Sequence, residues 1–368
     1  MYLATRDLAA AKGRFTLVGV VIGLIAFLAT MLAGLANGLV DDGISGLRAL
    51  PMTHLAFAEN SHGVFSRSIL TPEDLAAYEE VPGSEVTPIG VSFFNARPAA
   101  GNGSGETIDI ALFGVEGEGF LADASAAGEG EDLAAALDDG LVLSEELASS
   151  AEVGDEFTIV GTDITLPVVG FTFEGTYGHV PLAYTSLDTW QRLLYGEDAD
   201  GRFSAVAVGD GDDEALAEVA EASGTEVMTK EESYAGSPGF SAESATMTLI
   251  RGFLLVISAL VVGAFFTVWT IQRTRQIGLL KALGASSAYV VRDAMGQLAI
   301  VLAIAITIGA TAAFAMGALV GEGTPFSLPL GSVLWTAGIL GVVGMAGSLV
   351  ALRRITSVDP SISLTAAS

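Results

Sequence analysis

Cysteine is absent from this 368-residue chain and basic residues are scarce, with 16 Lys and Arg against 43 Asp and Glu. The lack of cysteine excludes disulfides, so any exposed domain must be held together by its own apolar core. The net charge of −27 disfavours nucleic acid as a partner, because phosphates repel a surface of the same sign.

Motifs for catalysis are also missing. No G-x-x-x-x-G-K-S/T phosphate loop is present, since none of the lysines is followed by Ser or Thr. There is no HExxH pair and no GxSxG elbow, and His54, His62 and His179 lack the spacing of a zinc site. We therefore expect no catalytic residues and no intrinsic cofactor or metal, so energy must come from a partner.

Four long apolar runs dominate what is present. Each exceeds the ~20 residues that cross ~30 Å of hydrocarbon as a helix. They predict transmembrane helices at 15–40, 245–272, 297–321 and 328–352. The first run is longer than the ~7–15 residues of a signal-peptide core, which favours an uncleaved anchor over a cleaved signal. The expected fold is an α-helical membrane protein with four transmembrane helices and a large mixed α/β extracytoplasmic domain, 41–244, between helices 1 and 2.

Basic residues gather near three ends of these runs, and Lys and Arg resist translocation. They are Arg6, Lys12 and Arg14, then Arg273, Arg275, Lys281 and Arg292, and finally Arg353 and Arg354. We therefore expect a multi-pass protein of the plasma membrane with both termini inside and the large domain outside. The remaining segments are a cytoplasmic N-terminus at 1–14, a cytoplasmic coupling segment at 273–296, an outer loop at 322–327 and a cytoplasmic C-terminus at 353–368.

The segment between the first two runs has helix and strand signals and most of the acidic residues, which favour solubility. Helices are expected to start at Thr71-Pro72, at Ser186 and at Asp212, where capping residues precede apolar positions, and to end near Gly196 and Gly224 in the last two cases. Strands are expected at 106–115, 156–160, 164–173 and 203–208, and Gly/Ala-rich loops at 100–105 and 124–130.

Small residues recur at helical spacing in the last two runs. They are Gly309, Ala313, Gly317 and Gly321, then Gly338, Gly341, Gly344 and Gly347. Small residues let helices approach closely in lipid, so the pattern predicts a packed bundle and is compatible with a homodimer.

The segment 272–296 predicts a short amphipathic cytoplasmic helix, either lying on membrane lipid or fitting a groove on an ATPase. Its residues TIQRTRQIGLLKALGAS, 270–286, resemble the signature of FtsX/MacB-like permeases of ABC systems. The ending Val358-Asp359-Pro360 with Leu364 is also similar to that family, although Ser363 stands where alanine is common. The resemblance implies a partner: two copies of a cytoplasmic ABC ATPase, which bind ATP and Mg. The residues expected to contact it are Arg275, Ile277, Leu280, Lys281, Leu283 and Gly284.

Four stretches are similar to the haem-exporting, HrtB-like branch of the family. They are YLATRDL at 2–8, AGLANGL at 33–39, GTYGH at 175–179 and FFTVWTIQ at 265–272. This similarity implies haem as the transported ligand. Neighbouring branches export lipids, peptides or antibiotics, or transmit signals without transport, and these remain alternatives.

Residues suited to haem lie at the outer end of the second run. Glu243, Met247 and Arg251 stand at i, i+4 and i+8 and so share a helix face. They offer an oxygen ligand, a thioether and a cation for propionates, with Phe27 and Met31 of the first run expected across from them. Glu243, Met31 and Met247 are the possible iron ligands, and Tyr177 and His179 form a possible relay. The alternatives are a helix-start acid, a snorkelling arginine, packing methionines and structural residues in a strand–loop transition.

Overall fold

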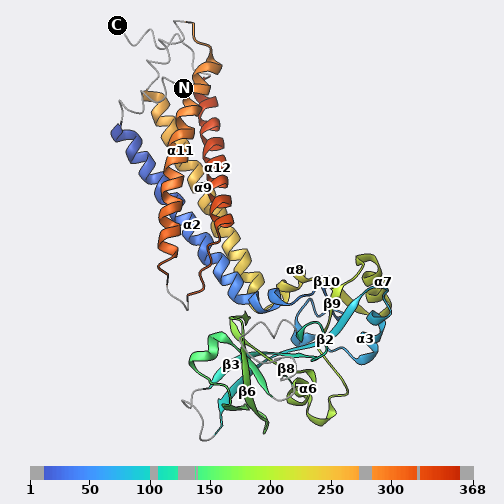
Figure 1. The fold of residues 1–368 in the computed structure, drawn as a ribbon. Coiled ribbons are helices and arrows are strands. Elements are labelled where there is room, and N and C mark those ends of the chain that lie inside the picture. Colours follow the sequence, from blue (N-terminus) through green and yellow to red (C-terminus); the bar gives the residue numbers. More distant parts are fainter. Residues whose placement is uncertain are drawn as a thin grey trace. The chain divides into compact units, whose positions relative to one another are not determined.

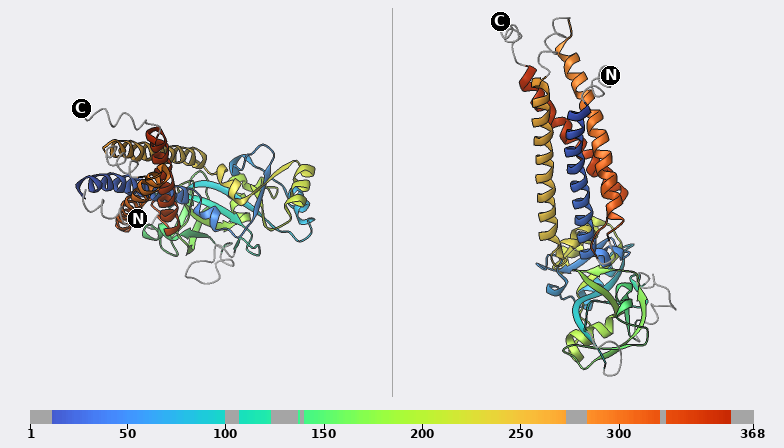
Figure 2. Two further views of the ribbon diagram at one scale, coloured as in Figure 1. Left: turned by 90° about the horizontal axis from the view of Figure 1, so that it is seen from above. Right: turned by 90° about the vertical axis from the view of Figure 1, so that its left-hand side faces the viewer.

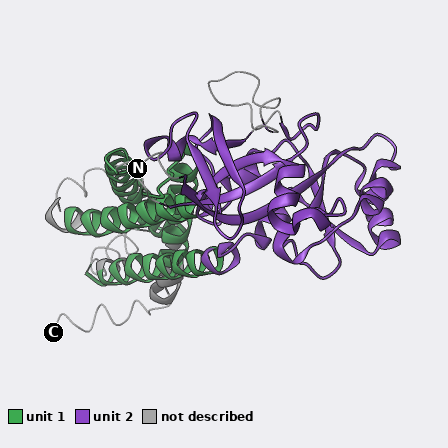
Figure 3. Ribbon diagram, turned by 90° about the horizontal axis from the view of Figure 1, so that it is seen from below, with its two compact units in different colours: residues 1–39, 244–368 green, residues 40–243 purple. Residues whose placement is uncertain are grey.

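The computed structural model describes residues 12–99, 107–122, 137, 140–272, 284–320 and 324–356. The chain forms two compact units (Figure 1), coloured separately in Figure 3. Unit 1 comprises residues 1–39 and 244–368, and unit 2 comprises residues 40–243. Each unit has its own apolar core.

Unit 1 is built from long helices that run alongside one another (Figure 2). They are α2, Lys12–Ala49, α9, Phe240–Gln272, α11, Ser287–Gly317, and α12, Leu330–Thr356. The end of α2 from residue 40 and the start of α9 up to residue 243 belong to unit 2. Each helix contains a segment long and apolar enough to cross a membrane. The predicted transmembrane segments lie largely within these helices, of which several continue beyond the predicted ends.

Small residues set the closest helix contacts of unit 1. A Cβ on Gly309 of α11 would lie 2.2 Å from the backbone oxygen of Gly23 on α2. A Cβ on Gly347 of α12 would lie 2.7 Å from the oxygen of Ala259 on α9. By contrast, Gly338 of α12 faces open space. Of the repeated small residues, Gly309 and Gly347 therefore lie at contacts between helix backbones, whereas Gly338 does not.

Large apolar side chains cover the outside of the bundle. On α9 they include Phe253, which is 60% exposed, and Leu260, which is 66% exposed. Such a surface costs free energy in water but not in hydrocarbon. The exposed faces therefore agree with helices that lie in a membrane.

Unit 2 contains a mixed sheet, and in its described part the strand order is β10-β1-β9-β2-β3-β8-β4-β6-β5. The strands are β1, His54–Ala58, β2, Glu85–Pro98, β3, Ile108–Val115, β4, Leu141–Ser144, β5, Glu156–Ile159, β6, Thr165–Thr172, β8, Val180–Ser186, β9, Ala205–Asp210, and β10, Thr225–Thr229; the short β7, Thr176–Tyr177, pairs with β8. The end of β2 also pairs with β5. The strands β2-β3-β8-β4-β6-β5 therefore form a closed, barrel-like sheet. The pairing β3–β8 is parallel, with Ala111 opposite Leu182.

Three helices of unit 2 begin where local signals predict. They are α3, Pro72–Glu79, α6, Leu187–Tyr195, and α7, Asp213–Ser223. Thr71 and Asp74 form a capping box on α3. Ser186 and Asp212 cap α6 and α7 by accepting backbone hydrogen bonds, and Gly196 and Gly224 end these helices with positive φ. The described part of unit 2 also contains the short helix α8, Lys230–Ser233, and the 3-10 turns η1, Phe65–Arg67, η3, Glu145–Ser149, η4, Gly196–Asp198, and η5, Tyr234–Gly236.

Several predictions need correction. Residues 287–296, expected in a separate amphipathic helix, form the start of the continuous helix α11, which Ser286 caps. Strands β1, β2, β4, β8 and β10 were not predicted. The expected loops at 100–105 and 124–130 lie outside the described residues.

Candidate functional site

A two-residue turn joins β7 to β8 and carries His179. Tyr177 pairs with Val180, which leaves Gly178 and His179 as the central residues. Their φ angles are 59° and 64°, and a turn with two positive φ values suits the twist of a hairpin. Glycine adopts such a conformation freely, whereas for histidine it is uncommon. The fold therefore holds His179 at a hairpin tip despite a backbone preference against it.

His179 lies between two carboxylates from different helices. Its Nδ1 is 2.7 Å from Asp42 Oδ2 on α2, and its Nε2 is 3.0 Å from Glu243 Oε1 in the first turn of α9. Each of the three side chains is about one-third exposed or less. We call these residues the Asp42–His179–Glu243 cluster. Because carboxylates only accept hydrogen bonds, both contacts are made together when the imidazole carries two protons.

Electrostatics favour this protonated form. Burial alone lowers the pKa of His179, but the hydrogen bonds to Asp42 and Glu243, and their negative charges, raise it above its ordinary value overall. An imidazolium between two carboxylates leaves a net charge of about −1 on the cluster. The cluster is therefore stabilised below the pKa of His179 and keeps an acidic character.

The hairpin that bears His179 is hydrogen-bonded to one turn of α2. The Gly178 N–H donates to the Gly43 carbonyl at 2.9 Å, and the Thr176 N–H donates to Ser45 Oγ at 2.8 Å. The hydroxyl of Ser237, which precedes α9, donates to the same Gly43 carbonyl. These bonds fix the hairpin tip to α2, so the position of His179 against Asp42 is set by the backbone.

Tyr177, the other residue of the predicted relay, is a core residue that is 2% exposed. Its ring stacks on Phe93 and makes edge contacts with Phe65 and Phe113. Burial raises the pKa of its hydroxyl, and a hydrogen bond with Ser237 opposes this. Its neighbours are those of a structural side chain, and His179 is the residue of this pair that meets charged groups.

Arg251 takes part in a second polar group, within unit 1. Its Nη2 donates to the Ala33 carbonyl at 3.3 Å and to Asn37 Oδ1 at 3.1 Å, both on α2. The Asn37 Nδ2 in turn donates to Ser332 Oγ on α12 at 2.8 Å. We call Arg251, Asn37 and Ser332 the three-helix polar network. Arg251 is exposed and forms no salt bridge in the described part of the chain.

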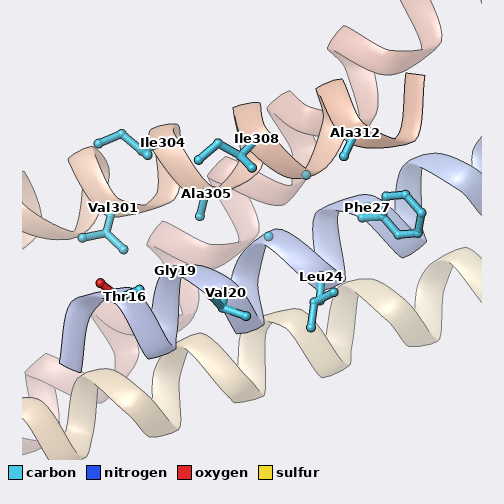
Figure 4. A pocket seen from close by; sticks show the side chains of 12 residues that line it. Thr16, Gly19, Val20, Leu24, Phe27, Val301, Ile304, Ala305, Ile308 and Ala312 are labelled. Carbon is cyan, nitrogen blue, oxygen red and sulfur yellow. The ribbon is translucent and has the colours of Figure 1, made fainter. Parts of the chain in front are cut away.

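The other predicted haem residues are half-buried. Met31 lies on α2 and Met247 on α9. Phe27 lines an apolar groove between α2 and α11 (Figure 4). Met247 and Arg251 stand four residues apart on α9, so they share a helix face within unit 1, whereas Glu243 belongs to unit 2.

Sequence reasoning missed Asp42, Asn37 and Ser332. Asp42 stands immediately beyond the first apolar run, which is the signal that could have found it. Of the predicted ATPase contacts, Gly284 has φ 96° just before α11. Arg275, Ile277, Leu280, Lys281 and Leu283 lie outside the described residues.

Four membrane-length helices among the described residues, together with a mixed α/β unit that matches a periplasmic core domain, define the chain as a membrane protein with a large extracellular domain. The family model for the MacB-like periplasmic core domain matches residues 15–222, and that for the FtsX-like permease C-terminal domain matches 248–360. The chain therefore belongs to the FtsX/MacB-like family of ABC-type permeases. Permeases of this kind generally work with a cytoplasmic ATPase, and membership suggests a non-catalytic transporter subunit.

Among curated relatives, the hemin transport system permease proteins HrtB of Staphylococcus haemolyticus and Staphylococcus epidermidis are 22% and 21% identical, each over 98% of both chains. The macrolide export ATP-binding/permease protein MacB of Wolinella succinogenes is 28% identical over 32% of this chain and 19% of its own. Among solved structures, the periplasmic region of MacB from Actinobacillus actinomycetemcomitans matches with a TM-score of 0.36 and 16% identity, covering 51% of this chain and 94% of that one.

Proposed function

We propose that the chain is the permease subunit of an ABC-type efflux system that exports haem from the membrane. The observation that carries this proposal is the continuity of α9 from Phe240 to Gln272. On this helix Met247 and Arg251 stand one turn apart, and in our proposal their thioether and guanidinium, together with the Glu243 carboxylate, bind the iron and the propionates of haem. The hemin transport permeases that align over 98% of both chains support haem as the substrate.

In this proposal His179 is a positioning residue for Glu243. Its hydrogen bond occupies the Glu243 carboxylate and orients it, as outer partners orient ligating groups elsewhere. Binding of iron to Glu243 then requires one of its two oxygens to be released from His179, which lies 3.0 and 3.2 Å from them. Met31, Met247, Arg251 and Phe27 complete the proposed haem-binding set.

The energy for export would come from ATP hydrolysis by two copies of a cytoplasmic ATPase bound to a permease homodimer. The segment around Lys281 would receive the motion, and α2 and α9 would transmit it to the outer domain. The spans have few ionisable groups, which agrees with mechanical transmission rather than a proton relay.

A second candidate is export of another hydrophobic molecule, such as a lipid, peptide or antibiotic. The partial match to the macrolide exporter MacB favours it. A third candidate, signal transmission to an extracellular partner without transport, is open to the FtsX-like class. The ligand response of the ATPase separates these from haem export.

The test is a haem titration of the purified permease in detergent, followed by the Soret band. We expect Glu243→Ala to weaken binding at least ~10-fold, the lower range for lost metal-site groups. Glu218→Ala is the matched control, because Glu218 is an exposed acid on α7 outside the proposed site. An unchanged haem affinity in Glu243→Ala, Met31→Ala and Met247→Ala, or haem-independent ATPase activity of the assembled complex, would reject haem and favour the other candidates.

A further inference from the structure

An apolar groove runs along α2 and α11 within unit 1 (Figure 4). Its volume is about 670 Å³ and its lining extends from Thr16 to Phe27 on α2 and from Val301 to Ala312 on α11. Thr16 contributes the single hydroxyl among the lining side chains. The groove shares Phe27 with the proposed haem-binding set but contains none of the residues proposed to ligate haem iron.

Glycine pairing explains why the groove exists. Gly23 and Gly309 bring the two backbones into contact and form part of the floor, together with the buried side chain of Ala305. A Cβ on Gly19 would meet nothing within 4 Å, so space beside the contact is unfilled by protein. Exposed side chains such as Leu24 and Ile308 form the rim. Protein interiors are normally close-packed, so we expect another molecule to fill this space.

We propose that one acyl chain of a membrane phospholipid occupies this groove. The two helices are of membrane-spanning length and composition, so the groove lies where hydrocarbon is the solvent. A polar occupant would lose its hydrogen bonds to water against a lining that offers one hydroxyl. The occupant is therefore apolar.

The length of the groove matches that of one acyl chain. From Thr16 to Phe27 the groove is about 17 Å long at a rise of ~1.5 Å per residue. One leaflet supplies about 15 Å of hydrocarbon, half of the ~30 Å core, which an acyl chain spans.

Charge at one end of the groove favours a phospholipid over a neutral hydrophobic molecule. Lys12 and Arg14 occupy the turn of α2 immediately before Thr16. Basic residues beside a membrane span attract anionic headgroups by about 1 kcal/mol each. The groove therefore combines an apolar channel of one-leaflet length with a basic sequence just before its first lining residue, Thr16. The inference goes beyond the proposed export of haem and does not depend on it.

The experiment uses the full-length permease in vesicles that contain an anionic phospholipid with a photoreactive diazirine in its acyl chain. After illumination, labelled peptides are mapped by mass spectrometry. We expect labelling of 16–27 and 301–312 to exceed that of the exposed α9 residues Val256 and Leu260 by at least threefold. Equal labelling of the two regions would overturn the proposal.

Two variants close the groove from opposite sides. Gly19→Leu places a larger side chain in the open space on the α2 side, and Ala312→Leu places one on the α11 side. Because the two variants are independent, the test remains possible if one of them fails to fold. We expect each to reduce labelling of the groove at least fivefold. Gly338→Leu is the matched control, because it makes the same change at an open helical position outside the groove, and its labelling should stay unchanged.

Other occupants give distinct results, and each would overturn the proposal. Persistent labelling in folded Gly19→Leu and Ala312→Leu would mean that the lipid contacts only the outer surface. Competition of the label by haem would identify the occupant as the exported cargo. Disulfide cross-linking of Leu24→Cys between two copies, with loss of the label on dimerisation, would identify the occupant as the second copy.

Discussion

At the scale of single residues, His179 is held by three constraints that reinforce one another. Its backbone is in the left-handed region, its hairpin is hydrogen-bonded to α2, and each ring nitrogen meets a carboxylate. A residue that only filled a turn would need none of the side-chain contacts. The Asp42–His179–Glu243 cluster therefore joins a side chain of α2 to one of α9 through a histidine whose pKa is raised above its ordinary value by the two carboxylates.

This geometry predicts a pH-dependent contribution of His179 to stability. Because the folded pKa of His179 lies above its unfolded value of ~6.5, the stabilisation is complete below pH ~6.5 and is lost as pH rises through the folded pKa. We expect His179→Ala to lower Tm by roughly 2–4 °C at pH 5.5 and by less at pH 8.5. A shift of roughly 2–4 °C is what the loss of a partly exposed ion pair causes in a domain of about 200 residues.

Thermal unfolding of both proteins over this pH range checks the prediction. Glu146, whose pKa is raised by burial and then by Asp42 and Glu174, is present in both proteins and cancels in the difference. His62→Ala is the control, since His62 also has a positive φ but no carboxylate contact among the described residues. A deficit for His179→Ala that is the same at both pH values would contradict the assigned role.

Asn37 has a comparable role in the three-helix polar network. It accepts from Arg251 and donates to Ser332, so Asn37→Leu removes two hydrogen bonds and leaves Arg251 with the Ala33 carbonyl alone. We expect a coupling energy of about 0.5–1.7 kcal/mol between Asn37→Leu and Arg251→Met in a double-mutant cycle, the range for polar contacts between membrane helices. Unfolding in mixed detergent measures it, and Ser332→Ala tests the hydrogen bond between Asn37 and Ser332. Strictly additive effects would show that the network carries no energy.

At the scale of elements, local signals were informative and long-range pairings were not. The starts of α3, α6 and α7 are encoded within a few residues, by Thr71, Ser186 and Asp212, and sequence alone predicted them. Strand β2 was missed because it contains Pro88, Gly90 and Pro98 and is stabilised by three different partners along its length. The Glu243–Met247–Arg251 spacing was predictable from helical periodicity. Asp42 as a partner of His179 was not, because it depends on the tertiary position of the β7–β8 hairpin.

The contact between α2 and α11 gives the clearest prediction for an element. A side chain at Gly309 would collide with the Gly23 backbone, which cannot yield as a flexible side chain can. We expect Gly309→Leu to destabilise the bundle by about 3 kcal/mol or more, at the upper end of overpacking costs, and to abolish cooperative melting of the purified protein. Gly338→Leu introduces the same side chain into open space and should melt like the wild type. Equal melting of the two variants would show that α2 and α11 do not approach at these glycines.

At the scale of the whole molecule, the chain combines a bundle with an apolar surface and a unit with a strongly acidic one. Residues 39–245 contain 39 of the 43 acidic residues and six basic ones, whereas the basic residues near the span ends lie outside that range. From this distribution we expect the basic segments on the cytoplasmic side, and it allows the acidic unit to be translocated. It also fits a permease that is driven by a separate cytoplasmic ATPase subunit.

The orientation can be tested directly because the absence of cysteine makes every introduced thiol unique. We expect Asp163→Cys, in the exposed turn between β5 and β6, to react with a membrane-impermeant maleimide in intact cells. Lys281→Cys, in the segment expected to meet the ATPase, should react only after permeabilisation, because positively charged segments stay inside. The unmodified protein is the blank and should remain unlabelled under both conditions. Labelling of Lys281→Cys in intact cells would place that segment outside, where no ATP is available, and would remove the route by which an ATPase could drive the permease.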